Sequence, residues 1–158
     1  MDIKVKKILS LTDEELDKIT SWMYSWWGER EGYTPEAIRE YYIHSLNDTR
    51  LPLTYGLYEG DLLIGTYQIT VSDLFVRPDI YPWLANVYIS PDKRAKGYGR
   101  FLLESVKENI TELPFDEIYL FTTHENLYEK YGWEYIGQIR TFLPGNDIQR
   151  LYRMKTHH

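Results

Sequence analysis

The sequence predicts an α/β protein, in the α+β sense, built on a mixed and mostly antiparallel sheet. Some segments alternate apolar and polar residues, as strands do, and others repeat apolar residues three and four apart, as helices do. One helical segment lies between two strand segments, and such a crossover joins parallel strands, so at least one parallel pair is expected. The expected sheet has six to seven strands and is flanked by about four helices.

The N-terminal third is expected to form one strand followed by two helices. Residues 4–9 alternate weakly and are interpreted as a strand. Thr12, with Glu15 three residues later, has the pattern of a capping box at the start of the first helix. Thr34 followed by Pro35 has the pattern of a second helix start, with proline at the first helical position.

Strand patterns dominate the rest of the chain. Two alternating segments flank a turn signal at 59–61 and predict a hairpin, and an irregular stretch, 72–82, follows them. Beyond this stretch, the apolar patterns predict strands at 83–89, 116–122, 133–141 and 149–155, and helices at 101–110 and 126–131.

Length and composition narrow the class of protein. The 158 residues fit one domain, 1–158, and 43% hydrophobic with 27% charged residues is ordinary for a soluble globular chain. The net charge of −6 disfavours nucleic acid as a partner. The chain has no cysteine, no signal segment and no apolar run near the ~18 residues that span a bilayer, so no membrane partner or thiolate metal site is expected and the expected location is cytoplasmic. The terminal His157 and His158 are assigned no function.

The most informative segment is 89–100, where a strand ends and an amphipathic helix begins. The first amides of a helix have no partner within it, and the helix dipole favours anions there. Gly97 and Gly99 permit a close backbone approach or a positive φ. By spacing alone, a phosphate-rich ligand and a solvated loop with turn glycines both stay open, and neither the nucleotide P-loop nor the dinucleotide fingerprint is matched. Four basic residues gather here, namely Lys93, Arg94, Lys96 and Arg100.

Two motifs resemble those of a known family. Segment 89–103 places Arg94, Gly97 and Gly99 in the pattern Arg/Gln-x-x-Gly-x-Gly/Ala after a strand, and it resembles the acetyl-CoA motif of the GNAT superfamily of N-acetyltransferases. Residues 127–133 follow a strand and resemble the family's Phe-Tyr-Glu-Lys-Leu-Gly-Phe segment. The order of elements matches over nearly the whole chain, so the resemblance implies the GNAT fold.

The resemblance also implies acetyl-CoA as the acyl-donor cosubstrate, with no metal. In the family, amides of the loop hold the CoA pyrophosphate, and the preceding strand pairs with the pantetheine arm and polarises the thioester carbonyl. Thr122 and Asn126 are further candidates for contacts with CoA, because the segment before residue 128 is shorter than in many members. The matching cofactor-binding positions are Val87, Tyr88, Ile89, Arg94, Ala95, Lys96, Gly97, Tyr98, Gly99 and Arg100.

The implied reaction is direct attack of an amine on acetyl-CoA, without an acyl-enzyme. Tyr128 matches the family's tyrosine that protonates the leaving thiolate, and a phenol of pKa ~10 suits that role when it is held in place. A packing role is the alternative for Tyr128. His124 is the first candidate for the general base, since it follows the strand that should flank the thioester, although a surface or capping role is equally open. Asp73, as a base, and Asn86, as a residue that holds a water, are weaker candidates.

The acceptor is expected to be a primary amine of a small molecule or a peptide N-terminus. The resemblance implies that the two N-terminal helices and the segment 72–83 line the acceptor cleft. The aromatic and acidic residues of these regions favour an organic cation. Trp22 and Trp26, four residues apart on the first helix, are interpreted as core residues. The candidate contacts to the acceptor are Trp27, Asp73, Trp83 and Asn86.

Two other functions stay open at this level. A CoA-binding or sensing module without turnover would keep the glycine loop, and an acyltransferase could use a longer acyl-CoA. Members of the family are often dimers, so the resemblance allows a homodimer, although the sequence shows no interface signature.

Overall fold

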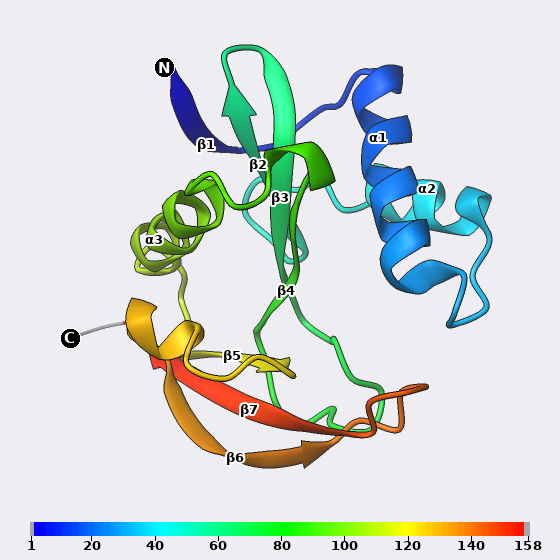
Figure 1. Ribbon diagram of the computed structural model, residues 1–158. Coiled ribbons are helices and arrows are strands. Elements are labelled where there is room, and N and C mark those ends of the chain that lie inside the picture. Colours follow the sequence, from blue (N-terminus) through cyan, green and yellow to red (C-terminus); the bar gives the residue numbers. More distant parts are fainter. Residues whose placement is uncertain (1, 157–158) are drawn as a thin grey trace.

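The structure, a computed structural model, describes residues 2–156, so His157 and His158 lie outside the described residues. Seven strands form one sheet in the order β1-β2-β3-β4-β5-β7-β6, which confirms the mixed, mostly antiparallel sheet that the sequence predicts (Figure 1). Only β4 and β5 are parallel among the described pairs, and helix α3 connects them. The strands are β1 (Ile3–Lys7), β2 (Leu53–Glu59), β3 (Leu62–Thr70), β4 (Trp83–Ile89), β5 (Glu117–Thr122), β6 (Glu134–Arg140) and β7 (Ile148–Lys155).

The helices begin where the sequence places their caps. Helix α1 (Asp13–Met23) has a complete capping box, because the Glu15 amide donates to Thr12 Oγ1 at 3.1 Å and the Thr12 amide donates to Glu15 Oε1 at 3.0 Å. Helix α2 (Pro35–Ile43) starts after Thr34, whose hydroxyl accepts from the Ala37 amide at 3.1 Å. Helix α3 (Tyr98–Ile110) has no side-chain cap.

The described residues contain three α-helices, one fewer than the sequence suggests. Segment 126–131 forms only a 3-10 turn, η3 (Tyr128–Tyr131). Asn126 precedes the turn at φ +62 and Gly132 ends it at φ +91. Both residues are left-handed, so only a few residues between them can be helical.

A π-helical turn, η1 (Tyr24–Gly28), extends α1 and changes which tryptophans are buried. Trp22 is 8% exposed, whereas Trp26 is 42% exposed, so the prediction that both lie in the core is wrong for Trp26. The wider π turn rotates Trp26 off the apolar stripe of α1. Its ring lies instead against Tyr88 of β4, with centroids 5.4 Å apart.

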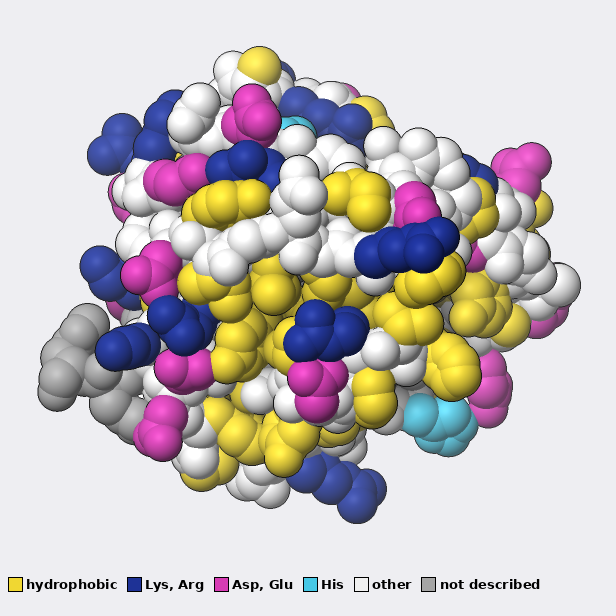
Figure 2. Space-filling model, turned by 90° about the horizontal axis from the view of Figure 1, so that it is seen from below, with side chains coloured by type: hydrophobic (Ala, Val, Ile, Leu, Met, Phe, Trp, Pro, Cys, Tyr) yellow, Lys and Arg dark blue, Asp and Glu magenta, His cyan; other side chains and the backbone are white. Residues whose placement is uncertain are grey.

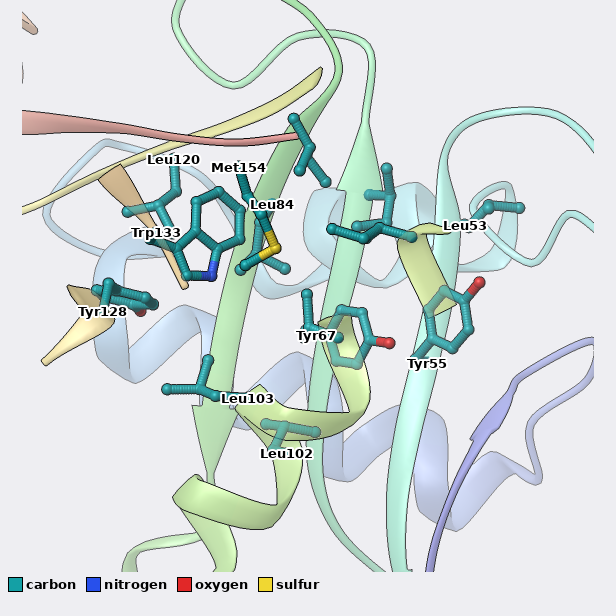
Figure 3. Close-up of a cluster of buried hydrophobic side chains, with 14 of the residues drawn as sticks. Leu53, Tyr55, Tyr67, Leu84, Leu102, Leu103, Leu120, Tyr128, Trp133 and Met154 are labelled. Carbon is teal, nitrogen blue, oxygen red and sulfur yellow. The ribbon is translucent and has the colours of Figure 1, made fainter. Parts of the chain in front are cut away.

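The hydrophobic core lies on both faces of the sheet (Figure 1). On one face, Leu102 and Val106 of α3 pack against side chains of β2 to β5, among them Tyr67 and Leu84 (Figure 3). On the other face, α1 and α2 bury their apolar stripes against β2, β3 and β4. Burial of such side chains contributes about 1.5–3 kcal/mol each, so the two layers hold the sheet from both sides. The residues buried in the second cluster are Leu16, Ile19, Trp22, Met23, Ile38, Tyr42, Tyr58, Leu63 and Tyr88.

A third cluster joins the start of β4 to the C-terminal half of the sheet. Trp83 is fully buried there, with Leu74 and Ile80 from the segment 71–82 and Ile139 and Leu151 from β6 and β7. Figure 2 views the molecule from below and shows hydrophobic side chains gathered across that face. Other large apolar side chains are exposed in segment 71–82 and between the end of β6 and the start of β7. They include Phe75, Val76, Tyr81, Phe142 and Ile148.

Candidate functional site

The site lies where the parallel strands β4 and β5 separate. Their described pairing consists of one position, Trp83 opposite Tyr119, next to which the Tyr119 amide donates to the Pro82 carbonyl at 3.0 Å. The rest of β4 pairs with β3, so within residues 2–156 no strand pairs with the other edge of β4 at 87–89. Figure 1 shows β4 and β5 diverging from this point. The free strand edge offers backbone amides and carbonyls to a ligand.

A bulge in β4 marks the same place. Two residues of β4, Asn86 and Val87, lie opposite Tyr67 of β3, because the register shifts between Thr66 and Gln68. Asn86 has φ +54, which is uncommon for a non-glycine residue. Bulges bend a strand and redirect its side chains, so this one turns the end of β4 away from β5.

The loop after β4 has the backbone geometry of an anion site. Pro91–Lys93 form a 3-10 turn, η2, after which Ala95 at φ +61 and Gly97 at φ +86 are both left-handed. Alternation of left- and right-handed residues turns successive amides toward one concave side, which binds anions. Gly97 is the N-cap of α3 and has no side chain to satisfy the first helical amides. The loop can therefore hold a pyrophosphate by its backbone.

The loop is tied to the sheet on both sides. Lys93 Nζ donates to Glu59 Oε1 of β2 at 2.8 Å, and the Tyr98 hydroxyl donates to the other oxygen of the same carboxylate. These two hydrogen bonds lower the pKa of Glu59, so it is ionised. Arg94 Nε donates to the Ile89 carbonyl at 3.0 Å. The loop is thus already shaped before a ligand arrives.

Two arginine side chains of this segment contact neighbouring side chains. The Arg94 guanidinium carbon lies 4.9 Å from the centre of the Tyr88 ring. Arg100 pairs with Glu104 one turn along α3, at 3.0 Å. Basic side chains therefore lie around the helix N-terminus, two of them paired with carboxylates, and the Arg94 guanidinium covers the Tyr88 ring. Contacts of these residues with CoA stay predictions.

Tyr128 begins η3, directly after β5. It is 8% exposed, and its ring packs edge-on against Trp133 with centroids 6.3 Å apart (Figure 3). The ring of Tyr152 lies tilted to it, with centroids 6.0 Å apart. Burial raises the pKa of Tyr128 to about 12, so the phenol carries its proton at neutral pH. A group in that state can donate a proton but cannot act as a base.

The other candidates after β5 surround Tyr128 in the chain. Thr122 is buried, and its hydroxyl accepts from the His124 amide at 3.1 Å, which forms a tight turn. His124 and Asn126 are both exposed. Their roles, as base and as CoA contact, stay predictions.

The four candidates for the acceptor site do not lie in one environment. The Trp83 ring is in the core, against Tyr119 and Phe121, and Trp27 is half-buried with its ring edge-on to Tyr33. Asn86 Nδ2 donates to Gln68 Oε1 at 2.8 Å. Asp73 is half-buried in the segment after β3.

Asp73 is the electrostatically unusual member. Burial, and then the nearby charge of Glu31, raises its pKa from 3.8 to about 7. The carboxyl therefore exchanges its proton near neutral pH, which is the property that acid–base catalysis requires.

Sequence reasoning missed Gln68, the hub of a buried polar network. Gln68 is fully buried in β3; besides Asn86, the Tyr41 hydroxyl donates to its Oε1 at 3.2 Å, and its own Nε2 donates to Thr54 Oγ1 at 3.0 Å. The signal was a single amide side chain within an apolar strand, which must find partners when buried. The network joins α2, β2, β3 and the bulge of β4.

Comparison with known proteins agrees with this geometry. A sequence model of the acetyltransferase (GNAT) domain matches residues 53–135, which is more than half of the chain. The protein therefore belongs to the GNAT acetyltransferase family and is an acyltransferase. A search of curated proteins gave no match.

Solved structures show the same fold. Spermidine N-acetyltransferase from Vibrio cholerae, in complex with CoA and spermine, has a TM-score of 0.72 and 20% identity over 98% of this chain and 95% of that chain. An aminoglycoside 6'-N-acetyltransferase complexed with coenzyme A has a TM-score of 0.73 and 13% identity over 98% of both chains. A GNAT-family acetyltransferase from Bacillus cereus ATCC 10987 has a TM-score of 0.67 and 20% identity, also over 98% of both chains. At these identities the likeness establishes the GNAT fold.

Two further findings concern residues 2–156. No helix there is long and apolar enough to cross a bilayer. Within the same residues, no group of three or more histidine or carboxylate side chains is arranged to hold a metal ion.

Gly97→Glu is expected to abolish binding of CoA. The new side chain would force a strained residue into the left-handed N-cap and place a negative charge where the phosphates bind. Gly145→Glu is the matched control, since Gly145 has φ +85 and no heavy atom within 4 Å of the place that a Cβ would occupy, as at Gly97, but lies between β6 and β7. Calorimetric titration with CoA measures the difference, and equal affinity of both folded variants would exclude the loop.

Asp73→Asn is expected to stabilise the protein at pH 8 and to change little at pH 4. The pKa of Asp73 is raised from 3.8 to about 7, so the folded protein favours the protonated carboxyl. The contribution of this carboxyl to the free energy of unfolding is therefore full below pH 3.8 and is lost as the pH rises to about 7. Asparagine resembles the protonated form, so a gain of about 1–2 kcal/mol is expected at pH 8, after allowance for partial solvent access.

The control for this variant lies in the same segment. Asp79 accepts two hydrogen bonds from Arg77, which lower its pKa, so Asp79→Asn should not stabilise the protein at pH 8. Urea unfolding at the two pH values measures both variants. Equal stability of Asp73→Asn and wild type at pH 8 would contradict the environment assigned to Asp73.

Proposed function

We propose that the protein is an acetyl-CoA-dependent N-acetyltransferase that moves the acetyl group directly to a primary amine. Three features at the end of β4 carry the proposal: its free edge at 87–89, the loop 94–97 with two left-handed residues, and the buried phenol ring of Tyr128. The ring belongs to the same core cluster as Leu84 of β4, and Val87 and Ile89 pack against that cluster. Membership of the GNAT family and the CoA-bound neighbours support it.

Each feature suits one part of acetyl-CoA. The loop amides fit the pyrophosphate, and the backbone of Val87, Tyr88 and Ile89 fits the amide-rich pantetheine arm, because an extended chain with amides can pair with an open strand edge. Hydrogen bonds from that edge to the thioester oxygen would stabilise the negative charge that develops there. Acetyl-CoA supplies the activated acyl group.

Tyr128 serves as the general acid in this proposal. Its proton remains bound at neutral pH, since burial raises the pKa to about 12. The CoA thiolate needs a proton only as the C–S bond breaks. The thiol that forms is more acidic than this phenol, so the proton transfer depends on the position of the hydroxyl rather than on a matched pKa.

The acceptor is proposed to be an amine. The neighbours named for spermidine and aminoglycosides act on small-molecule amines, which supports this choice.

Tyr128→Phe is expected to lower kcat by about 100-fold and to leave the affinity for acetyl-CoA within about 2-fold, because the ring still packs and only the proton donor is lost. Tyr131→Phe removes a hydroxyl from the same turn and should keep wild-type rates. Release of free thiol from acetyl-CoA with an amine acceptor measures kcat. Equal rates for wild type and Tyr128→Phe would assign the proton to water.

The length of the acyl group is tested with the acceptor held fixed. Acetyl-CoA is expected to give the highest kcat/KM in a series with succinyl-CoA and octanoyl-CoA. A higher value for either longer donor would replace acetyl transfer by transfer of that group. Tight binding of CoA with no transfer from any donor would support a sensing module instead.

A further inference from the structure

Asp73 and Glu31 form a pair of carboxylates without a counter-ion, here called the acidic pair. Asp73 follows β3, Glu31 follows η1, and each is half-buried. Among residues 2–156 neither carboxylate makes an ion pair, and the charge of Arg30 only partly offsets the effect of burial on Glu31. Two such groups near one another repel, so a cation between them would be stabilised.

A buried hydroxyl faces the same place without a partner. Tyr42 of α2 is 0% exposed, and its hydroxyl makes no hydrogen bond with any described residue. Burial raises the pKa of both Tyr42 and Tyr41, and the charge of Asp73 adds a smaller contribution to each, so both phenols lie near the carboxylate. Buried polar atoms are nearly always satisfied, and a polar ligand beside Asp73 would satisfy this one.

The charged and titratable groups around Asp73 are therefore Glu31, from the segment after η1, and the two phenols of α2. Arg30, whose charge lowers the pKa of Glu31, is not among the groups that shift the pKa of Asp73. The raised pKa of Asp73 follows from this environment. A ligand ammonium would reverse the effect and lower the pKa again.

The acidic pair is connected to the strand that would hold the thioester. Tyr41, which lies near Asp73, donates to Gln68, and Asn86 at the bulge of β4 donates to the same oxygen. Two hydrogen bonds thus connect Tyr41, a neighbour of Asp73, to the bulge of β4 through Gln68. An amine held at Asp73 lies on the α2 side of this strand, opposite the face covered by α3.

We infer, on the basis of the proposed function, that the acidic pair selects an acceptor amine that carries a second cationic group. The reacting ammonium gives its proton to Asp73. Glu31 holds the other cation. Trp27 and Tyr33 flank Glu31 in the chain and contact each other edge-on at 5.7 Å, so they offer apolar surface to the carbon chain between the two charges. The acceptor class is a small diamine or polyamine.

The protons balance in this scheme. The Asp73 carboxylate takes one proton from R–NH3+, and the free amine forms the C–N bond as the C–S bond breaks. Sulfur gains one proton from Tyr128, and the nitrogen loses a second proton, which replaces the one that Tyr128 has given up. The net reaction is R–NH3+ + CH3CO–SCoA → R–NH–COCH3 + HS–CoA + H+, with Tyr128 reprotonated and the proton on Asp73 released to solvent.

The test compares acceptors of equal carbon chain and different charge. The probes are 1,4-diaminobutane, butylamine and 4-aminobutanoate, each assayed by thiol release from acetyl-CoA and titrated calorimetrically into the protein with CoA, which needs no turnover. The proteins are wild type, Asp73→Asn, Glu31→Gln and Glu29→Gln, the last being an exposed acid near Glu31 that serves as the control.

Wild type should favour the diamine over butylamine by at least 10-fold in both kcat/KM and affinity, and should reject the amino acid. Glu31→Gln should remove that preference by raising KM about 10-fold with little change in kcat, whereas Glu29→Gln should keep it. Asp73→Asn should lower kcat about 100-fold. It should also abolish the acid limb near pH 7 in the pH profile of kcat/KM, which reports the free enzyme.

Several results would overturn the inference and leave the proposed function intact. They are equal kcat/KM for diamine and butylamine, a preference that survives Glu31→Gln, and an acid limb that disappears in His124→Ala but not in Asp73→Asn. If acetyl is transferred to no amine, the proposed function fails. The calorimetric preference for the diamine then still decides whether the acidic pair binds dications, and its absence overturns the inference as well.

Discussion

The contact of Trp83 with Tyr119 sets the geometry of the whole site. It is the one described register position of the parallel pair, and beyond it β4 and β5 diverge. Trp83 is fully buried and packs on Tyr119 and Phe121 at 6.3 and 5.8 Å, so the two strands are held at one end by aromatic packing. The bulge at Asn86 turns β4 away at the other end. A free strand edge in the middle of a sheet is costly unless a ligand or water satisfies it, and this is where we place the thioester.

Charges of opposite sign lie on the two sides of that edge. The basic residues of segment 93–100 surround the N-terminus of α3, although the chain as a whole carries −6. The acidic pair and the phenols of α2 lie on the other side, and the Gln68 network connects them to the bulge. An anionic donor would be attracted to the N-terminus of α3, and a cationic acceptor to the acidic pair. In the proposed function, the reacting atoms would meet at β4.

The order of the elements and the two motifs could be predicted from the sequence, because each depends on local patterns. Capping boxes, glycines and apolar periods act within a few residues, and the boundaries of most elements followed from them. The position of Trp26 could not be predicted, since the π turn that displaces it depends on the packing of η1 against α2. The two elements approach closely there, because a Cβ on Gly28 would lie 2.4 Å from Ile38 Cδ1.

The candidate site could be predicted less well than the fold, because it depends on contacts between residues that are far apart in the chain. The environment of Asp73 comes from Glu31, Tyr41 and Tyr42, which are about thirty to forty residues away in the chain, so no local pattern indicated it. His124 is the first candidate for the base from the sequence because it follows the strand expected to flank the thioester, which is a matter of its place in the chain alone. The partner of Asn86 was equally hidden, as strand pairing rather than sequence brings Gln68 beside it.

The most direct test of the central claim is a series of melting temperatures with acetyl-CoA, CoA, ATP and NAD at equal concentration. A ligand at 100 times its Kd stabilises a protein by about 2.7 kcal/mol, which raises Tm by roughly 5–10 °C for a chain of this size. We predict such a rise with acetyl-CoA and CoA and little change with ATP and NAD. In the proposed function the open strand edge pairs with pantetheine, which ATP and NAD lack, in addition to the contacts of the loop with phosphate. No rise with either CoA species, in folded protein, would contradict this claim.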